Sequence, residues 1–169
     1  MKLIVAVDAC WGIGRENNLL FSFPEDKAFF RKKTTGKIIV MGRRTLMSLP
    51  NAAPLKNRTN IVLTTHRDME AQGALMCNSI GHLNRLLSAY ESDDVYVIGG
   101  HSVYEQLYNC CDEAFVTKID ADGCADRFFP DIDRQAHWVL KEQTDKKLDG
   151  GLTFNFCLYE NKKIERMPL

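Results

Sequence analysis

Short, uninterrupted runs of apolar residues recur along this chain, and they limit the folds open to it. Four such runs, each bounded by turn residues, cover 3–7, 37–41, 60–64 and 95–98. Runs of this length are typical of strands that are buried on both faces of a parallel sheet. Because segments with helical spacing separate them, the chain is predicted to form an α/β sheet.

The helical segments carry recognisable start signals. Residues 24–34 have helical spacing, with Ser22 and Glu25 placed as a capping box, and a short helix is expected after Gly42. Ser102 and Glu105 repeat the capping-box spacing ahead of Leu107. Ser79 is predicted to cap a helix whose apolar stripe is Leu83, Leu86, Leu87 and Tyr90.

The pattern changes after the strand-like stretch at 113–119. Two further strand-like stretches, 138–144 and 153–159, are separated by residues 145–151, which are typical of a hairpin with a longer loop. No linker or repeat divides the chain. We therefore predict one domain over residues 1–169: a mostly parallel central sheet flanked by helices, ending in an antiparallel hairpin.

Charge and composition narrow the function. The 22 Lys and Arg residues balance 22 Asp and Glu residues, so the broad positive field that nucleic-acid and anionic-membrane binders use is absent. Apolar runs fall far short of the roughly 20 residues that cross a bilayer, and Asp8 interrupts the first run too early for a signal peptide. The six cysteines and four histidines lack metal-ligand spacing. We expect a cytoplasmic protein with reduced thiols and no metal.

Basic and hydroxyl side chains follow two of the predicted strands, where α/β sheets bind their ligands. Guanidinium groups match phosphate geometry, so these residues predict a phosphate-bearing cofactor, although a solvated basic helix start would look the same. The residues are Gly42, Arg43, Arg44 and Thr45 after one strand, and Thr64, Thr65, His66 and Arg67 after the other.

Gly99 and Gly100 follow the strand at 95–98. Paired glycines allow the backbone to approach a ligand closely, but a plain tight turn has the same sequence. The third glycine of the Rossmann fingerprint is missing, which argues against a standard dinucleotide-binding site of that kind.

Asp26 is the most unusual residue, because it lies on a predicted helix among several phenylalanines. Desolvation in such a setting raises the pKa of a carboxyl group, which can then hold a proton or bind an amidine-like pair of nitrogens. The alternative is an exposed carboxylate in the first helical turn, a role for which Glu25 is better placed.

Taken in order, these motifs resemble those of bacterial dihydrofolate reductase, from Leu3 to about Tyr159. The matching landmarks are Ile13-Gly14, Leu19, Asp26, Phe30, Thr34, Val40-Met41-Gly42-Arg43-Arg44-Thr45, Asn60-Ile61-Val62-Leu63, Val97-Ile98-Gly99-Gly100, Thr117-Lys118-Ile119 and Phe129-Pro130-Asp131.

The resemblance implies reduction of dihydrofolate by NADPH in tetrahydrofolate synthesis and one-carbon metabolism. Asp26 would bind N3 and the 2-amino group of the pterin and promote protonation at N5, with Thr117 steadying it and Phe21 nearby. Arg58 would bind the α-carboxylate of the folate tail. The walls of the pterin and nicotinamide pocket would be Ile4, Val5, Ala6, Phe30, Leu49, Ile98 and Tyr104.

The same resemblance implies a cofactor site, a cis peptide at Gly99-Gly100, and a mobile loop over about 8–21 that closes on the nicotinamide. A 2′-phosphate site would favour NADPH over NADH. Antifolate inhibitors are expected ligands, and a monomer is expected. The cofactor residues would be Ala6, Ile13, Gly14, Leu19, Gly42, Arg43, Arg44, Thr45, Leu63, Thr64, Thr65, His66, Ile98, Gly99, Gly100, His101, Ser102, Val103 and Tyr104.

The chain departs from the family pattern near Asp26. Leu20-Phe21 replaces Pro-Trp, so the indole N–H that organises a water near the pterin in the family is lost. Lys27 replaces an uncharged neighbour, and Lys56-Asn57 stands where Pro-Gly commonly precedes the tail-binding arginine. We expect a functional enzyme with slower protonation or altered inhibitor binding.

Two alternatives stay open at this point. One is a pyrimidine reductase of riboflavin biosynthesis, which shares this architecture and cofactor; Asp26 and Arg58 at their matching positions argue against it. The other is a degenerate binding module that holds nucleotide without turnover, which the loss of the indole at Phe21 would suit.

Overall fold

The computed structural model describes residues 1–167 and confirms an α/β fold. The predicted apolar runs form β1 (Lys2–Val7), β4 (Ile38–Gly42), β5 (Thr59–Leu63), β7 (Val95–Gly99) and β8 (Glu113–Ile119). Their apolar side chains are almost completely buried, which is why the runs are continuous rather than alternating.

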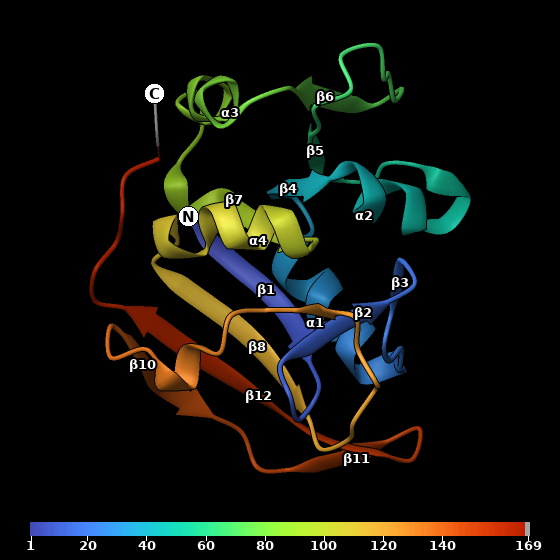
Figure 1. Cartoon of the computed structure of the whole chain (residues 1–169), viewed down its shortest axis with the longest axis vertical. Helices are drawn as coiled ribbons and strands as arrows, with labels where there is room; N and C mark the ends of the chain where they lie inside the picture. Colours follow the sequence, from blue (N-terminus) through green and yellow to red (C-terminus); the bar gives the residue numbers. More distant parts are fainter. Residues whose placement is uncertain (168–169) are drawn as a thin grey trace.

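The main sheet has the order β10-β12-β8-β1-β7-β4-β5-β6. The strands from β8 through β6 (Ala74–Cys77) are parallel, and β12 (Leu152–Asn161) runs antiparallel to β8. Figure 1 shows this sheet from β6 at the top to β10 and β12 at the bottom, with α4 in front of it. The mostly parallel sheet with an antiparallel C-terminal pair is as predicted.

The C-terminal hairpin differs from its prediction. Strand β10 (Trp138–Gln143) pairs with β12, and β11 (Lys147–Asp149) continues the pairing along β12. The long loop expected over 145–151 is therefore wrong, since the chain turns at Gly150 and Gly151, which have φ of 57° and 79°. Positive φ at both turn positions suits glycine and allows a tight connection.

The helices are α1 (Pro24–Thr34), α2 (Arg43–Ser48), α3 (Ile80–Leu87) and α4 (His101–Leu107). The cap of α3 is confirmed, because the Ser79 side chain accepts a hydrogen bond from the His82 N–H. Tyr90 is not part of its stripe, since the helix ends at Leu87. The capping box at Ser102 is also wrong: Ser102 lies inside α4, whose cap residue is Gly100.

The capping box predicted for α1 is wrong as well, because a distant residue takes its place. Phe23 is the cap residue and provides no side-chain hydrogen bond. Instead Oδ2 of Asp149, beside the hairpin turn, accepts a 2.9 Å hydrogen bond from the N–H of Glu25. The C-terminal hairpin thus caps the helix that carries Asp26.

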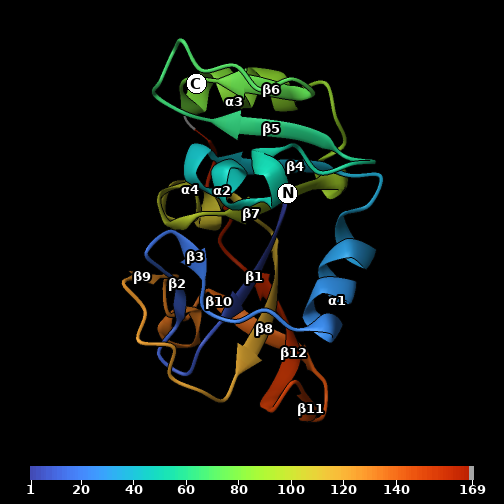
Figure 2. The same cartoon turned by 90° about the vertical axis from the view of Figure 1, so that its right-hand side faces the viewer.

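A second, smaller sheet was not predicted. It consists of β2 (Gly12–Arg15), β3 (Asn18–Leu19) and β9 (Arg127–Phe128), in the order β3-β2-β9. Figure 2 places these strands on the opposite side of β1 and β8 from α1. Short 3-10 turns complete the fold at Pro50–Ala52, Ser92–Asp94, Tyr108–Cys110 and Ile132–Arg134.

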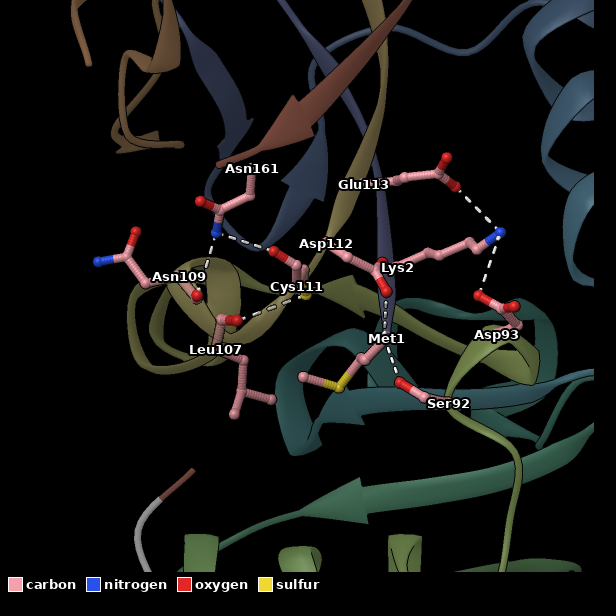
Figure 3. A network of polar contacts seen from close by, with 10 residues as sticks. All are labelled: Met1, Lys2, Ser92, Asp93, Leu107, Asn109, Cys111, Asp112, Glu113 and Asn161. Carbon is pink, nitrogen blue, oxygen red and sulfur yellow. Dashed lines mark hydrogen bonds and ion pairs between the residues drawn. The ribbon is translucent and has the colours of Figure 1, made fainter. Parts of the chain in front are cut away.

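Polar contacts tie the chain together at the amino ends of β1 and β8, away from the predicted site (Figure 3). The Met1 ammonium lies 3.1 Å from Asp112 Oδ2, and Lys2 Nζ lies 2.9 Å from Glu113. The Asn161 amide donates to the backbone oxygens of Asn109 and Cys111. These contacts hold the amino ends of β1 and β8 in place, at the opposite end of the strands from the carboxyl ends where ligands are expected.

No helix in the described part of the chain is long and apolar enough to span a membrane. Within residues 1–167, no group of three or more His, Cys, Asp or Glu side chains is arranged to hold a metal ion.

Candidate active site

A cavity of about 500 Å³ opens at the carboxyl ends of the parallel strands. Its walls come from the segments that follow β4, β5 and β7, together with β1 and the small sheet. Every residue predicted to bind cofactor lines this cavity except Gly99, which is buried. Arg67 does not line it. The structure therefore gathers in one place residues predicted from separate motifs.

Glycines give this cavity its close-fitting backbone. The Gly99–Gly100 peptide is cis, as the resemblance implies. A Cβ on Gly99 would lie 2.7 Å from the Tyr104 ring, and one on Gly42 would lie 3.1 Å from Val103. These positions have no room for a side chain, so the backbone itself forms the wall.

The lining chemistry fits a dinucleotide phosphate such as NADPH. Arginines, histidines, hydroxyls and backbone groups face the same space, and no Asp or Glu of the described chain lines it. Such a donor set suits phosphate groups. The apolar residues Ala6, Ile13 and Ile98 contribute apolar surface to the same cavity.

Several lining residues were missed from sequence. Asn78, Ser79 and Ile80 follow β6, a strand that was not predicted because Leu75 is exposed and breaks the buried pattern. Arg127 lies on a strand of two residues, too short for any periodicity. The other missed residues are Arg15, Asn17, Asn18, Ser48 and Gln106.

Asp26 lies outside this cavity lining, half-buried on α1. Its Oδ1 accepts a 2.7 Å hydrogen bond from Oγ1 of Thr117, a buried residue of β8. Burial raises the pKa of the Asp26 carboxyl group, while the hydrogen bond from Thr117 opposes that rise. Lys27 is exposed, so its side chain does not share the setting of Asp26.

Tyr104 lines the cofactor cavity and also contacts Ile4, one of the residues predicted to wall the pterin pocket. Its hydroxyl donates a 2.7 Å hydrogen bond to the backbone oxygen of Ile4, and its ring lies against the Gly99 backbone. Complete burial raises the pKa of Tyr104 strongly, so the phenol stays protonated and acts as a donor.

The other residues predicted to contact the substrate are apolar, except for Arg58. Ile4, Phe30, Leu49 and Ile98 pack in one hydrophobic cluster, and Phe21 packs partly buried against a cluster of Phe23, Ile119 and Phe154. Apart from Ile98, none of these lines the large cavity.

Arg58 is held in a fixed orientation. Its Nε donates to Thr34 Oγ1 at 2.9 Å, and Nη1 donates to the Lys56 backbone oxygen at 2.9 Å. Its guanidinium carbon lies 5.8 Å from the centre of the Phe30 ring. Partial burial lowers the pKa of Arg58, but a guanidinium group remains charged at any physiological pH.

The segment 8–21 is tied to the connection between β8 and β9. Buried Asp8 accepts hydrogen bonds from two N–H groups of its own turn, at 2.8 and 2.7 Å, and from the N–H of Gly123 at 3.1 Å. Asp126 Oδ2 accepts another from the N–H of Glu16 at 3.0 Å.

The fold and the site define an α/β protein whose cavity is suited to a phosphate-bearing cofactor. The family model described as dihydrofolate reductase matches residues 1–162. The chain belongs to the dihydrofolate reductase family.

Individual relatives agree with this assignment. The chain is 37% identical to dihydrofolate reductase of Bacillus subtilis (strain 168) over 168 residues, covering 98% of this chain and 97% of that one. It is 35% identical to dihydrofolate reductase of Neisseria gonorrhoeae, covering 89% and 91%. The solved structure of dihydrofolate reductase from Enterococcus faecalis, complexed with NADP(H) and RAB-propyl, superposes with a TM-score of 0.85 at 32% identity and covers 95% of each chain.

The reaction of this family is the reduction of dihydrofolate with NADPH, which makes the chain an oxidoreductase with NADPH as its cofactor. These matches favour dihydrofolate reductase over the pyrimidine reductase of riboflavin biosynthesis.

Proposed function

We propose that Asp26 is the carboxyl group that binds the pterin of dihydrofolate and promotes protonation at N5. The observation that carries this proposal is the half-buried position of Asp26 together with its hydrogen bond from Thr117. Burial raises the pKa of Asp26, so a proton is available to higher pH than on an exposed aspartate. A carboxyl group can also bind N3 and the 2-amino group through its two oxygens.

Thr117 is the positioning residue for this carboxyl group. Its hydroxyl donates to Oδ1, which leaves Oδ2 and the second lone pair of Oδ1 for a ligand. Because Thr117 is buried on a central strand, its hydroxyl is held by the sheet rather than by a loop. The apolar side chains of Ile4, Phe30, Leu49 and Ile98 would exclude water around the pterin.

Arg58 would bind the α-carboxylate of the folate tail. Its hydrogen bonds to Thr34 and Lys56 fix the plane of the guanidinium group before any ligand arrives. A guanidinium group that is already oriented loses little entropy when it pairs with a carboxylate.

The residues of the large cavity would hold NADPH, which supplies the hydride when bound. Arg43, Arg44 and Thr45 would contact its phosphates, while Thr65 and His66 would favour the 2′-phosphate that distinguishes NADPH from NADH. Segment 8–21 would close over the nicotinamide end, since Ile13, Gly14 and Leu19 line that cavity.

Phe21 would contribute an apolar wall near Asp26. A phenylalanine has no N–H with which to hold a water, so proton delivery to N5 would be slower than with an indole at this position. Antifolates would compete with dihydrofolate here; the Enterococcus faecalis relative is complexed with NADP(H) and RAB-propyl.

The assay that tests this proposal follows NADPH oxidation after purified protein, NADPH and dihydrofolate are mixed. We expect activity that Asp26→Asn lowers by about 100-fold or more, in the range that general acid catalysis contributes. Direct titration of both proteins with NADPH is the control, and equal affinity is expected. Undiminished turnover in Asp26→Asn would refute the role of Asp26.

We also propose that the protein is a cytoplasmic monomer. The proposed location follows the bacterial dihydrofolate reductases that the chain matches over almost its whole length, and the proposed monomer follows the family resemblance. Light scattering coupled to size-exclusion chromatography should give a mass near 19.2 kDa, and twice that mass would exclude a monomer.

A further inference from the structure

Two arginines of the small sheet line the cofactor cavity, although the resemblance assigns them no role. Arg15 comes from β2 and Arg127 from β9, and they share the cavity with Arg43 and Arg44. No carboxylate of the described chain lines that space. In a chain with a formal net charge of zero, four arginines around one cavity point to an anion.

The small sheet holds Arg127 close to the end of β7. Arg127 is paired with Gly14 of β2, which itself lines the cavity. The backbone oxygen of Phe128 lies 2.7 Å from Nδ1 of His101, the first residue of α4. This contact joins β9 to the segment directly after Gly100.

The position of Arg127 near the end of β7 makes the diphosphate of NADPH its expected ligand, rather than the 2′-phosphate. Thr65 and His66 follow β5, which is separated from β7 by β4 in the sheet. Two strand spacings of about 4.8 Å put the end of β5 roughly 10 Å from the end of β7. The 2′-phosphate is on the adenosine and the diphosphate is nearer to the nicotinamide. With Thr65 and His66 assigned to the 2′-phosphate, Arg127 near the end of β7 would therefore face the diphosphate.

Both guanidinium groups are free to bind a ligand. Arg127 reaches Asp126 Oδ1 only at 3.9 Å and uses Nη1 on a backbone oxygen, and about half of its side chain is exposed. Arg15 is exposed and forms no ion pair among residues 1–167.

We propose that Arg127, with Arg15, binds the diphosphate of NADPH from the small-sheet side of the cavity, while Arg43 and Arg44 bind from α2. This assignment rests on the proposed function, since it takes NADPH as the ligand of the cavity. Each arginine would donate charge-assisted hydrogen bonds to phosphate oxygens.

Direct binding tests the proposal without turnover. Wild type, Arg127→Gln and Arg15→Gln are titrated with NADPH and with NADH at several salt concentrations. Arg134→Gln is the matched control, because Arg134 is exposed, pairs with Asp131 at 3.2 Å and does not line the cavity. Thermal unfolding checks that each variant is folded.

For Arg127→Gln we expect the Kd of NADPH and of NADH to rise by the same factor, about tenfold, and to depend less on salt. Arg15→Gln should act in the same direction, and Arg134→Gln should bind as wild type. An unchanged Kd in folded Arg127→Gln overturns the proposal, and so does a loss confined to NADPH, which would place Arg127 at the 2′-phosphate. If wild type binds NADPH but does not reduce dihydrofolate, the proposed function fails while the binding result stands.

Discussion

Oγ1 of Thr117 lies 2.7 Å from Oδ1 of Asp26, although 91 positions separate the two residues in the chain. The contact joins β8 of the sheet to α1, and it acts on the pKa of the one carboxyl group to which we assign the proton chemistry. Burial and this hydrogen bond act on the pKa of Asp26 in opposite directions.

Replacing Thr117 with Val should move the pH dependence of the reaction. The hydroxyl lowers the pKa of Asp26, so its loss should raise that pKa further and shift the midpoint of the rate profile to higher pH. Thr117→Ser keeps the hydroxyl and is the control. Coincident profiles for all three proteins would mean that the hydrogen bond does not tune Asp26.

Asp26→Asn should stabilise the fold at neutral pH while it lowers activity. The raised pKa means that the folded chain binds the Asp26 proton more tightly than the unfolded chain does, so stability falls as pH rises from the ordinary pKa of 3.8 in the unfolded chain through the higher one in the folded chain. Asparagine does not ionise, so the Asp26→Asn protein does not lose this stability as pH rises. Urea unfolding should show a gain at pH 7 that shrinks in acid, whereas a constant difference would contradict it.

Asp149→Ala should destabilise the protein by about 1 kcal/mol, because the N–H of Glu25 at the start of α1 loses its acceptor. Lys147→Ala is the control. It removes only an exposed ion pair with Glu25 at 3.5 Å and should cost about 0.5 kcal/mol or less. Equal losses in denaturant unfolding would refute the cap.

Phe21→Trp tests the proton route. An indole N–H could hold a water near the pterin, so we expect faster turnover at high pH, where protonation limits the rate. The pH-rate profiles of the two proteins are to be compared at saturating NADPH. If they coincide, Phe21 does not restrict protonation.

The strands of the main sheet could be predicted because burial on both faces leaves continuous apolar runs, as in Ile39, Val40 and Met41. The strands β6, β9 and β11 were missed because they are short or partly exposed. Both wrong capping boxes reflect tertiary contacts, most clearly Asp149, which lies 124 positions from Glu25.

Site residues could be predicted from the sequence where several of them directly follow one predicted strand, as Gly42, Arg43 and Arg44 do. Arg15 and Arg127 could not be predicted, because no local sequence pattern shows that the small sheet lies beside the carboxyl ends of the main-sheet strands. Likewise the burial of Asp26 could be predicted from its aromatic neighbours, while its contact with Thr117 depended on the family resemblance.

The most direct test of the account is the pH dependence of the hydride-transfer rate, measured by stopped flow with NADPH already bound, for wild type and Asp26→Asn. We predict that the wild-type rate is high in acid and falls as pH rises through a midpoint above 3.8, the ordinary pKa of an aspartate. Asp26→Asn should be slow and lack that midpoint. The same midpoint in both proteins would show that another group controls protonation.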